Sequence, residues 1–154
     1  MRVADRLRRE PPALDAAASL GDAARLMART GLGALPVLRR GALIGVLDAG
    51  DLARARPSAA TTLTVHEIHA RLDQVPVARV LGPTLSAVGR RTPLADAIRL
   101  MRARRLAALP VVRGDALTGL LTEEDLLDLL VTLLDDEAAR DGADEPTPGG
   151  VGPR

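Results

Sequence analysis

Two aspartates, Asp51 and Asp125, stand 74 residues apart, each just inside the start of an expected helix. A carboxylate can accept hydrogen bonds from two adjacent hydroxyl groups, and the N-terminus of a helix presents free N–H groups to an anion. Thr122 precedes Asp125 by three positions, and Asp48 precedes Asp51 by the same spacing. We therefore treat the two aspartates as the centres of two related candidate clefts.

The same aspartates also have a purely structural explanation. An acidic side chain in the first turn of a helix interacts favourably with the helix dipole, by about 0.3–1 kcal/mol. Thr122 is a good helix cap whether or not it binds anything, so a binding role would be additional. Short motifs do not separate these two interpretations, and both stay open.

Other polar residues offer weaker signals. His66 and His69 flank Glu67 and could share one helix face as metal ligands, but H-E-I-H differs from the zinc motif H-E-x-x-H and no third ligand is evident. A solvated helix is the favoured interpretation. Arginines occur in pairs at 39–40, 90–91 and 104–105. We interpret them as solvated charge, with contact to phosphate as the alternative. Because no catalytic constellation can be identified, we do not expect an enzyme.

An internal repeat organises the elements that must position these residues. Residues 1–54 align without a gap on residues 75–128, and 22 of the 54 pairs are identical. Such a match indicates duplication and two units related by a pseudo-two-fold axis. We expect a first repeat at 1–56, a linker at 57–74, a second repeat at 75–136, and a disordered acidic, Pro- and Gly-rich tail at 137–154.

Both repeats are predicted to contain the same elements. Each begins with a short helical entry, followed by a brief strand, a helix, two strands and a second helix. In the first repeat these are expected at 3–7, 13–14, 19–30, 34–38, 42–47 and 49–55. In the second repeat the entry helix is expected at 77–81, the strands at 86–88, 108–112 and 116–121, and the last helix at 122–136. The first main helix of this repeat is expected to start with Thr92 as its cap and Pro93 at its first helical position. The linker is predicted to contain a helix from Thr64 to about Asp73.

Composition narrows the classes of function. The chain has 154 residues, no Phe, Tyr, Trp or Cys, and a net charge of +1. The core must be aliphatic, and neither a nucleic-acid footprint nor a membrane footprint is visible. No signal peptide and no apolar run of about 20 residues is present, so we expect a soluble cytoplasmic protein that binds neither membrane nor nucleic acid.

In its motifs the chain resembles a tandem pair of CBS domains, often called a Bateman module. The first repeat carries D-A-A-R-L-M at 22–27, L-P-V at 35–37 and G-V-L-D-A-G-D at 45–51. The second carries D-A-I-R-L-M at 96–101, L-P-V at 109–111 and G-L-L-T-E-E-D at 119–125. The resemblance implies an α/β (α+β) fold, with two pseudo-symmetric CBS repeats, each a small sheet packed with two main helices. The two sheets are expected to pack together and leave two clefts.

The resemblance also implies ligands and a site. In related modules the clefts bind AMP, ADP, ATP or S-adenosylmethionine, the aspartate accepts hydrogen bonds from ribose hydroxyls, and the Ser or Thr before it contacts phosphate. Carried over to this sequence, one cleft comprises Asp125, Thr122 and Leu120, with Ala18, Ala23, Leu32, Gly33 and Ala34 from the other repeat. The second comprises Asp51 with Thr92, Ala97, Leu106, Ala107 and Ala108.

The two clefts differ in charge. Asp48 occupies the hydroxyl position of the second cleft, where a second carboxylate repels phosphate by about 1 kcal/mol or more. We therefore expect Asp125 to be the stronger site. Gly33, Ala34, Ala107 and Ala108 stand where many phosphate-binding relatives have Arg or His, so phosphate charge would have to be met by Arg90, Arg91, Arg104, Arg105 or a partner chain.

The function expected is that of a regulatory module that senses an adenosine-type ligand without a required cofactor. It would signal to a protein partner by a change of shape or association. The alternative is a structural or interaction module with no small-molecule ligand. A homodimer is expected, with the leucine-rich helix at 123–134 as one face.

Overall fold

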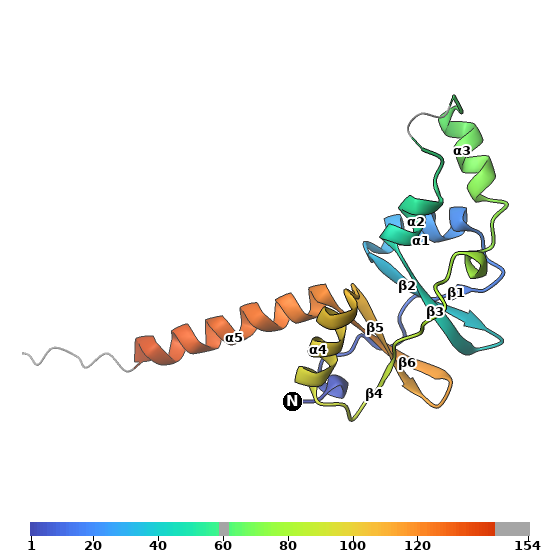
Figure 1. The fold of residues 1–154 in the computed structure, drawn as a ribbon. Helices are drawn as coiled ribbons and strands as arrows, with labels where there is room; N and C mark the ends of the chain where they lie inside the picture. The colour runs from blue at the N-terminus through green and yellow to red at the C-terminus, as the bar shows by residue number, and fades with distance from the viewer. Residues whose placement is uncertain (59–61, 144–154) are drawn as a thin grey trace, which may run out of the picture.

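The computed structural model describes residues 1–58 and 62–143, in two similar units joined by a linker helix (Figure 1). The first unit contains β1 (Leu14–Asp15), α1 (Leu20–Thr30), β2 (Ala34–Arg39), β3 (Ala42–Asp48) and α2 (Ala49–Ala55). The second contains β4 (Val88–Gly89), α4 (Leu94–Arg104), β5 (Ala108–Arg113), β6 (Ala116–Thr122) and α5 (Glu123–Ala143). The linker helix is α3 (Val65–Leu72). The predicted α/β fold with two pseudo-symmetric repeats is confirmed.

Each unit has a three-stranded sheet built in the same way. A short first strand runs parallel to the second, and the second pairs with the third as an antiparallel hairpin. The hairpins of the two units meet through the pairing of Ala42 with Ala116, which joins the strands in the order β1-β2-β3-β6-β5-β4. The unit that carries each candidate aspartate is therefore fixed to its neighbour at the hairpin ends.

The entry segments are exchanged between the units. Val3–Asp5 and Val77–Arg79 form short 3-10 helices, η1 and η2. Val3, from the first repeat, is fully buried in the core of the second unit, and Val77 is fully buried in the core of the first. The amide N–H of Val3 donates to the carbonyl of Thr92 at 3.0 Å, and that of Val77 donates to the carbonyl of Ala18 at 2.8 Å. Neither core is complete without a segment of the other repeat.

Local sequence signals set most helix boundaries. Ser19 and Asp22 form the predicted capping box of α1, and Thr64 and Glu67 form that of α3. Gly31 ends α1 in the left-handed conformation, with φ 72°, which glycine adopts without steric cost. These predictions are confirmed.

Several boundaries differ from the sequence-based expectation, most by one or two residues. Helix α4 begins one residue later than expected, with Pro93 as its cap, because the N–H and carbonyl of Thr92 bond to Gly89 and Val3. The brief strands are at Leu14–Asp15 and Val88–Gly89, shifted by one or two residues. Helix α5 continues to Ala143, which corrects the disorder predicted for residues 137–143, since its Ala and Arg residues there favour helix. The remainder of the predicted tail lies outside the described residues.

Within the described residues, every helix is too short or too polar to cross a bilayer. Helix α5 contains 21 residues but includes eight acidic side chains.

Candidate functional site

Asp125 and Thr122 form a reciprocal capping box at the start of α5. Asp125 Oδ2 accepts hydrogen bonds from the Thr122 amide at 2.9 Å and the Thr122 hydroxyl at 2.6 Å. The hydroxyl in turn accepts from the Asp125 amide at 3.1 Å. Thr122 is buried and the Asp125 side chain is 18% exposed, so the box is rigid while one carboxylate oxygen remains near the surface.

That remaining oxygen faces Arg8, a residue from the first repeat. Arg8 Nη2 lies 3.5 Å from Asp125 Oδ1, and the Arg8 backbone pairs with Leu120 through two hydrogen bonds of 2.8 and 2.9 Å. Arg8 could not be predicted from the sequence, because the residue aligned with it in the second repeat is Gly82 and the repeat pattern does not reveal the exchange of entry segments. Arg8 adds a positive charge beside the candidate cleft.

A glycine in β6 permits the entry segment to come this close. A Cβ atom on Gly119 would lie 2.4 Å from Leu7 Cδ1 and 3.0 Å from the Arg8 carbonyl oxygen. At the equivalent Gly45 in β3, the three atoms nearest to such a Cβ all belong to the Leu81 side chain, the first at 2.8 Å. Both repeats thus use glycine for close packing of an entry segment, and the contact at Gly119 includes backbone.

Asp51 is held in a more acidic arrangement at the start of α2. Its Oδ2 accepts from the Asp48 amide at 3.0 Å, and the Asp48 carboxylate accepts from the Asp51 amide at 2.7 Å. Asp51 Oδ1 forms an ion pair with Arg54 at 2.5 Å. Both Asp51 oxygens therefore have partners, and a second carboxylate stands beside them.

A small apolar cluster lies between the units and connects the two candidate clefts. Leu120 packs with Ala34 and Ala108, each almost inaccessible to solvent, and Val46 and Ala107 pack around them. The amide of Ala49 donates to the Gly33 carbonyl, and that of Glu123 donates to the Ala107 carbonyl, at 2.9 and 3.1 Å. These bonds fix the start of each second helix beside the segment that begins the central strand of its own unit.

One cavity collects several of the predicted residues. It has a volume of about 80 Å³ and is lined by Ala34, Val46, Asp48, Thr84, Ser86, Leu106, Ala107 and Ala108. Leu106, Ala107 and Ala108 were predicted for the Asp51 cleft, where Asp48 replaces the hydroxyl residue, and Ala34 was predicted for the Asp125 cleft. Thr84 and Ser86 were not predicted, and the hydroxyl pair before the brief strand β4 is the signal that could have indicated them.

Other predicted site residues lie in or against the cores. Ala23 and Ala97 are fully buried and Leu32 is 5% exposed, each within the core of its own unit. Ala18 packs against the first core, and its carbonyl accepts the amide of Val77. The backbone carbonyl of Thr92 accepts a hydrogen bond from the amide of Val3. Ligand contact by these five side chains stays a prediction.

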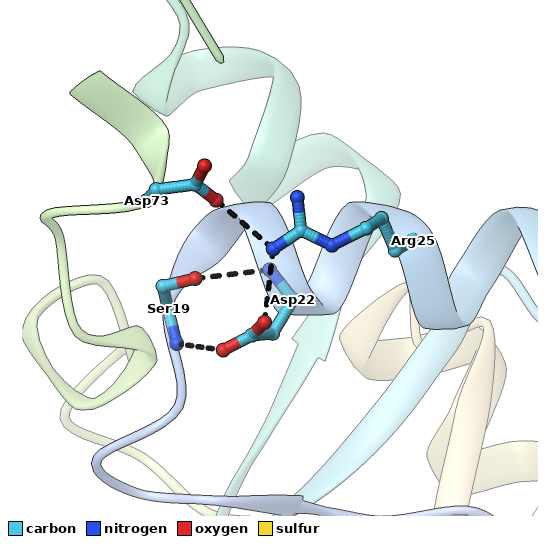
Figure 2. A network of polar contacts seen from close by, with 4 residues as sticks. All are labelled: Ser19, Asp22, Arg25 and Asp73. Atoms are coloured by element: carbon cyan, nitrogen blue, oxygen red, sulfur yellow. Dashed lines mark hydrogen bonds and ion pairs between the residues drawn. The ribbon is translucent and has the colours of Figure 1, made fainter. Parts of the chain in front are cut away.

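A polar network ties the linker helix to α1, as Figure 2 shows. Arg25 donates to Asp22 at 2.9 Å and to Asp73, the C-terminal cap of α3, at 3.0 Å. Hydrogen bonds from the Ser19 amide, and then from Arg25, lower the pKa of Asp22 below its ordinary value. Hydrogen bonds from the Thr64 backbone and hydroxyl likewise lower the pKa of Glu67. The Asp22 carboxylate thus caps α1 and binds Arg25, which also contacts Asp73, and the Glu67 carboxylate caps α3.

The histidines of α3 are exposed on that same helix. His66 and His69 lie at solvent-accessible positions. Within the described part of the chain, no group of three or more His, Cys, Asp or Glu side chains is arranged to hold a metal ion.

This arrangement of two interlocked units, each with a capped aspartate after its last strand, defines a tandem CBS module. The sequence model of the CBS domain matches residues 3–58 and 65–132. The chain belongs to the CBS domain family and contains two copies of that domain.

Particular relatives agree with this assignment. The chain is 31% identical over 121 residues to the CBS domain-containing protein YhcV of Bacillus subtilis (strain 168), covering 79% of this chain and 77% of YhcV. The fold is similar to AcuB of Vibrio cholerae, named for acetoin utilization, with a TM-score of 0.75, 24% identity and coverage of 90% and 97% of the two chains. It is also similar to CBSX2 in complex with AMP, with a TM-score of 0.69, 23% identity and coverage of 86% and 97%.

Proposed function

We propose that this chain is a cytoplasmic regulatory module that binds an adenosine-containing ligand at Asp125 and signals its presence to a protein partner. The observation that carries the proposal is the rigid Thr122–Asp125 box, with Asp125 Oδ1 directed toward Arg8 of the other repeat. The CBS module of CBSX2, which has the same fold, was solved in complex with AMP. The role proposed is regulation rather than catalysis.

In the bound state Asp125 Oδ1 would accept a hydrogen bond from a ribose hydroxyl. The Arg8 side chain is 38% exposed, and its guanidinium lies 3.5 Å from Asp125 Oδ1. This guanidinium could therefore turn toward a phosphate group of the ligand. The N-terminus of α5 adds the positive end of its dipole, while its Glu123 and Asp125 amides already donate to Ala107 and Thr122. A nucleoside phosphate has the groups that such a site can bind.

Binding between the units would require them to separate slightly. Small-molecule sites usually have volumes of about 300–1,000 Å³, whereas the cavity between the units, which is lined by Asp48 and not by Asp125 or Thr122, measures about 80 Å³. A ligand that favours the opened arrangement would shift the population toward it. Because Arg8 and Leu120 are hydrogen-bonded across the repeats, movement at the ligand would be transmitted to the entry segment.

The alternative is a structural or interaction module without a small-molecule ligand. The Asp48 carboxylate in the cavity and the occupied oxygens of Asp51 favour this alternative for the Asp51 cleft. Asp125 Oδ1 has only the 3.5 Å contact with Arg8, so it is the more available acceptor. The ligand-sensing proposal therefore predicts that Asp125 is needed for binding, and the ligand-free alternative predicts no binding at all.

We also propose that the module forms a homodimer through α5. Five apolar side chains of this helix are between 48% and 62% exposed: Leu127, Leu130, Val131, Leu133 and Leu134. Helix α5 contains eight acidic residues and one Arg, whereas residues 1–122 contain 19 Arg and ten acidic residues. Figure 1 shows α5 extending away from the body of its own chain, so the arginine-rich body of a second copy is the complementary surface.

A thermal-shift titration with AMP, ATP and S-adenosylmethionine tests ligand sensing. At a concentration 100 times its dissociation constant, a ligand that binds only the folded state stabilises it by about 2.7 kcal/mol. We expect a concentration-dependent shift with at least one compound, lost in Asp125→Ala and retained in Asp51→Ala. No shift with any of the three would support the ligand-free alternative.

A further inference from the structure

A hollow lined by four arginines lies at the outer side of the second unit. Its volume is about 470 Å³, within the range of small-molecule sites. The lining residues are Arg2, Ala4, Gly89, Arg90, Arg91, Val112 and Arg113, and we call this the Arg90 hollow. None of the seven is acidic, so every charged residue of the lining is positive.

This hollow is separate from the candidate clefts. It lies where the parallel strands β4 and β5 end, since Gly89 pairs with Val112 in the last register position. Ala107 and Ala108, which line the cavity between the units, are at the opposite end of β5. Val112 is four positions after Ala108, roughly 13 Å along an extended strand. Ligands of open sheets commonly bind beyond the carboxyl ends of the strands.

The backbone that carries the four arginines is rigid. The Ala4 amide donates to the Arg90 carbonyl at 3.0 Å, and the Thr92 amide donates to the Gly89 carbonyl at 3.1 Å. Arg2 forms an isolated antiparallel bridge with Pro93. The entry segment and the turn after β4 are thus bonded together, which reduces the conformational freedom lost when a ligand binds.

Among residues 1–58 and 62–143, no acidic side chain forms an ion pair with the arginines of this hollow. The ion pairs formed by the described residues involve Arg8, Arg25, Arg54 and Arg99, and none of the four arginines of the hollow. The nearby carboxylate of Asp5 accepts the backbone amide of Arg2 at 2.7 Å as part of the capping of η1. Four guanidinium groups around one concavity repel each other, and an anion relieves that repulsion.

The pseudo-symmetric position in the first unit shows that the fold does not require this charge. There a hollow of about 480 Å³, the Arg39 hollow, is lined by Asp15, Ala16, Ala17, Arg39, Arg40, Pro76, Ala78 and Arg79. The aligned residues Asp15, Ala16 and Ala17 are replaced by Gly89, Arg90 and Arg91 in the second unit. The lining residues thus carry a formal charge of +4 in the Arg90 hollow and +2 in the Arg39 hollow.

We propose that the Arg90 hollow binds a small molecule through two adjacent phosphate groups. Arginine presents a planar fork of donors that matches phosphate oxygens in pairs, and four such groups suit the charge of a pyrophosphate. No aromatic residue exists in the chain to stack on a base, so recognition is of the phosphates themselves. This site is independent of the nucleoside site proposed at Asp125.

Calorimetric titration of the full chain with inorganic pyrophosphate, at low and physiological salt, tests the proposal. We expect one pyrophosphate per chain, bound at least tenfold more tightly than inorganic phosphate. Arg90→Gln and Arg113→Gln should each weaken binding about tenfold or more, and Gly89→Asp, which restores the acid of the first repeat, should do the same. A Cβ at Gly89 meets open space, so this substitution is compatible with the fold.

The Arg39 hollow provides the matched control. Arg39→Gln removes the same charge from the equivalent strand end and should leave pyrophosphate binding unchanged, as should Asp125→Ala. Equal weakening in Arg39→Gln would reveal general charge attraction, and absence of binding to the wild-type chain would contradict the site outright. Loss of binding in Asp125→Ala would place pyrophosphate at the candidate cleft instead and would overturn the proposal.

Discussion

The guanidinium of Arg8, from the first repeat, lies 3.5 Å from the carboxylate of Asp125 in the second. The contact exists because the two repeats exchange their entry segments, which also places Val3 and Val77 in each other's cores. The chain is therefore more than two domains joined by a linker. The candidate ligand site of the second unit includes a residue of the first.

Arg8 is predicted to recognise phosphate rather than nucleoside. Arg8→Gln removes the cation beside Asp125 Oδ1 but leaves the Thr122–Asp125 box in place. We expect about tenfold weaker binding of AMP, a loss of roughly 1.4 kcal/mol, and little change for adenosine. Arg9→Gln, at an exposed neighbouring position, is the control. An equal loss for adenosine and AMP would show that Arg8 has no phosphate-specific role.

The close approach of the entry segment predicts an asymmetry between two equivalent glycines. Gly119→Ala forces a methyl group against Leu7 and the Arg8 backbone, and should destabilise the fold by about 1–3 kcal/mol. The nearest atoms to the methyl group of Gly45→Ala belong to the flexible Leu81 side chain, so this change should cost less. Urea unfolding of the two variants measures the difference. A smaller cost at Gly119 than at Gly45 would contradict the packing described.

Exchange of the entry segments predicts that the first residues of the chain stabilise the second unit. Val3 is fully buried in that unit's core, so Val3→Ala should lower the free energy of unfolding by about 1.5–3 kcal/mol. Val65→Ala, at a 70% exposed position of α3, should change it by less than about 0.5 kcal/mol. If both variants unfold like the wild type, the entry segment does not contribute to the core.

Helix α5 predicts the state of association. If its exposed leucines bind a second copy, light scattering should give a mass twice the 16.1 kDa of the chain. Leu130→Glu places a charge in the apolar face at a half-exposed position and should yield the monomer without lowering the stability of each chain. Val65→Glu, equally polar but on α3, should leave the dimer intact. A wild-type monomer at high concentration would contradict the proposal.

Local signals were sufficient for most of the fold. The Ser19 and Thr64 capping boxes, Gly31 at a helix end and the repeated L-P-V segments each depend on neighbours only a few residues away, so the sequence pattern alone predicts them. The aspartate after each hairpin could be predicted for the same reason.

Features that depend on the other repeat could not be predicted in this way. The partner of Asp125 is Arg8, more than one hundred residues distant, and no spacing rule connects them. Thr84 and Ser86 line the cavity between the units only because the segment before β4 passes that cavity. Helix α5 continues to Ala143, although disorder was predicted from residue 137 onward. The prediction gave weight to the acidic residues of this segment and not to its Ala and Arg residues, which favour helix.

Direct titration of AMP into the wild-type chain and its Asp125→Ala and Asp51→Ala variants tests the central claim. We expect measurable binding to the wild type, at least a tenfold loss in Asp125→Ala, and a smaller effect in Asp51→Ala. The reason is that Asp51 Oδ1 is held by Arg54 at 2.5 Å beside the Asp48 carboxylate, whereas Arg8 lies 3.5 Å from Asp125 Oδ1. Unchanged AMP affinity in Asp125→Ala, in a variant that still folds, would contradict the assignment of Asp125 as the ligand-binding carboxylate.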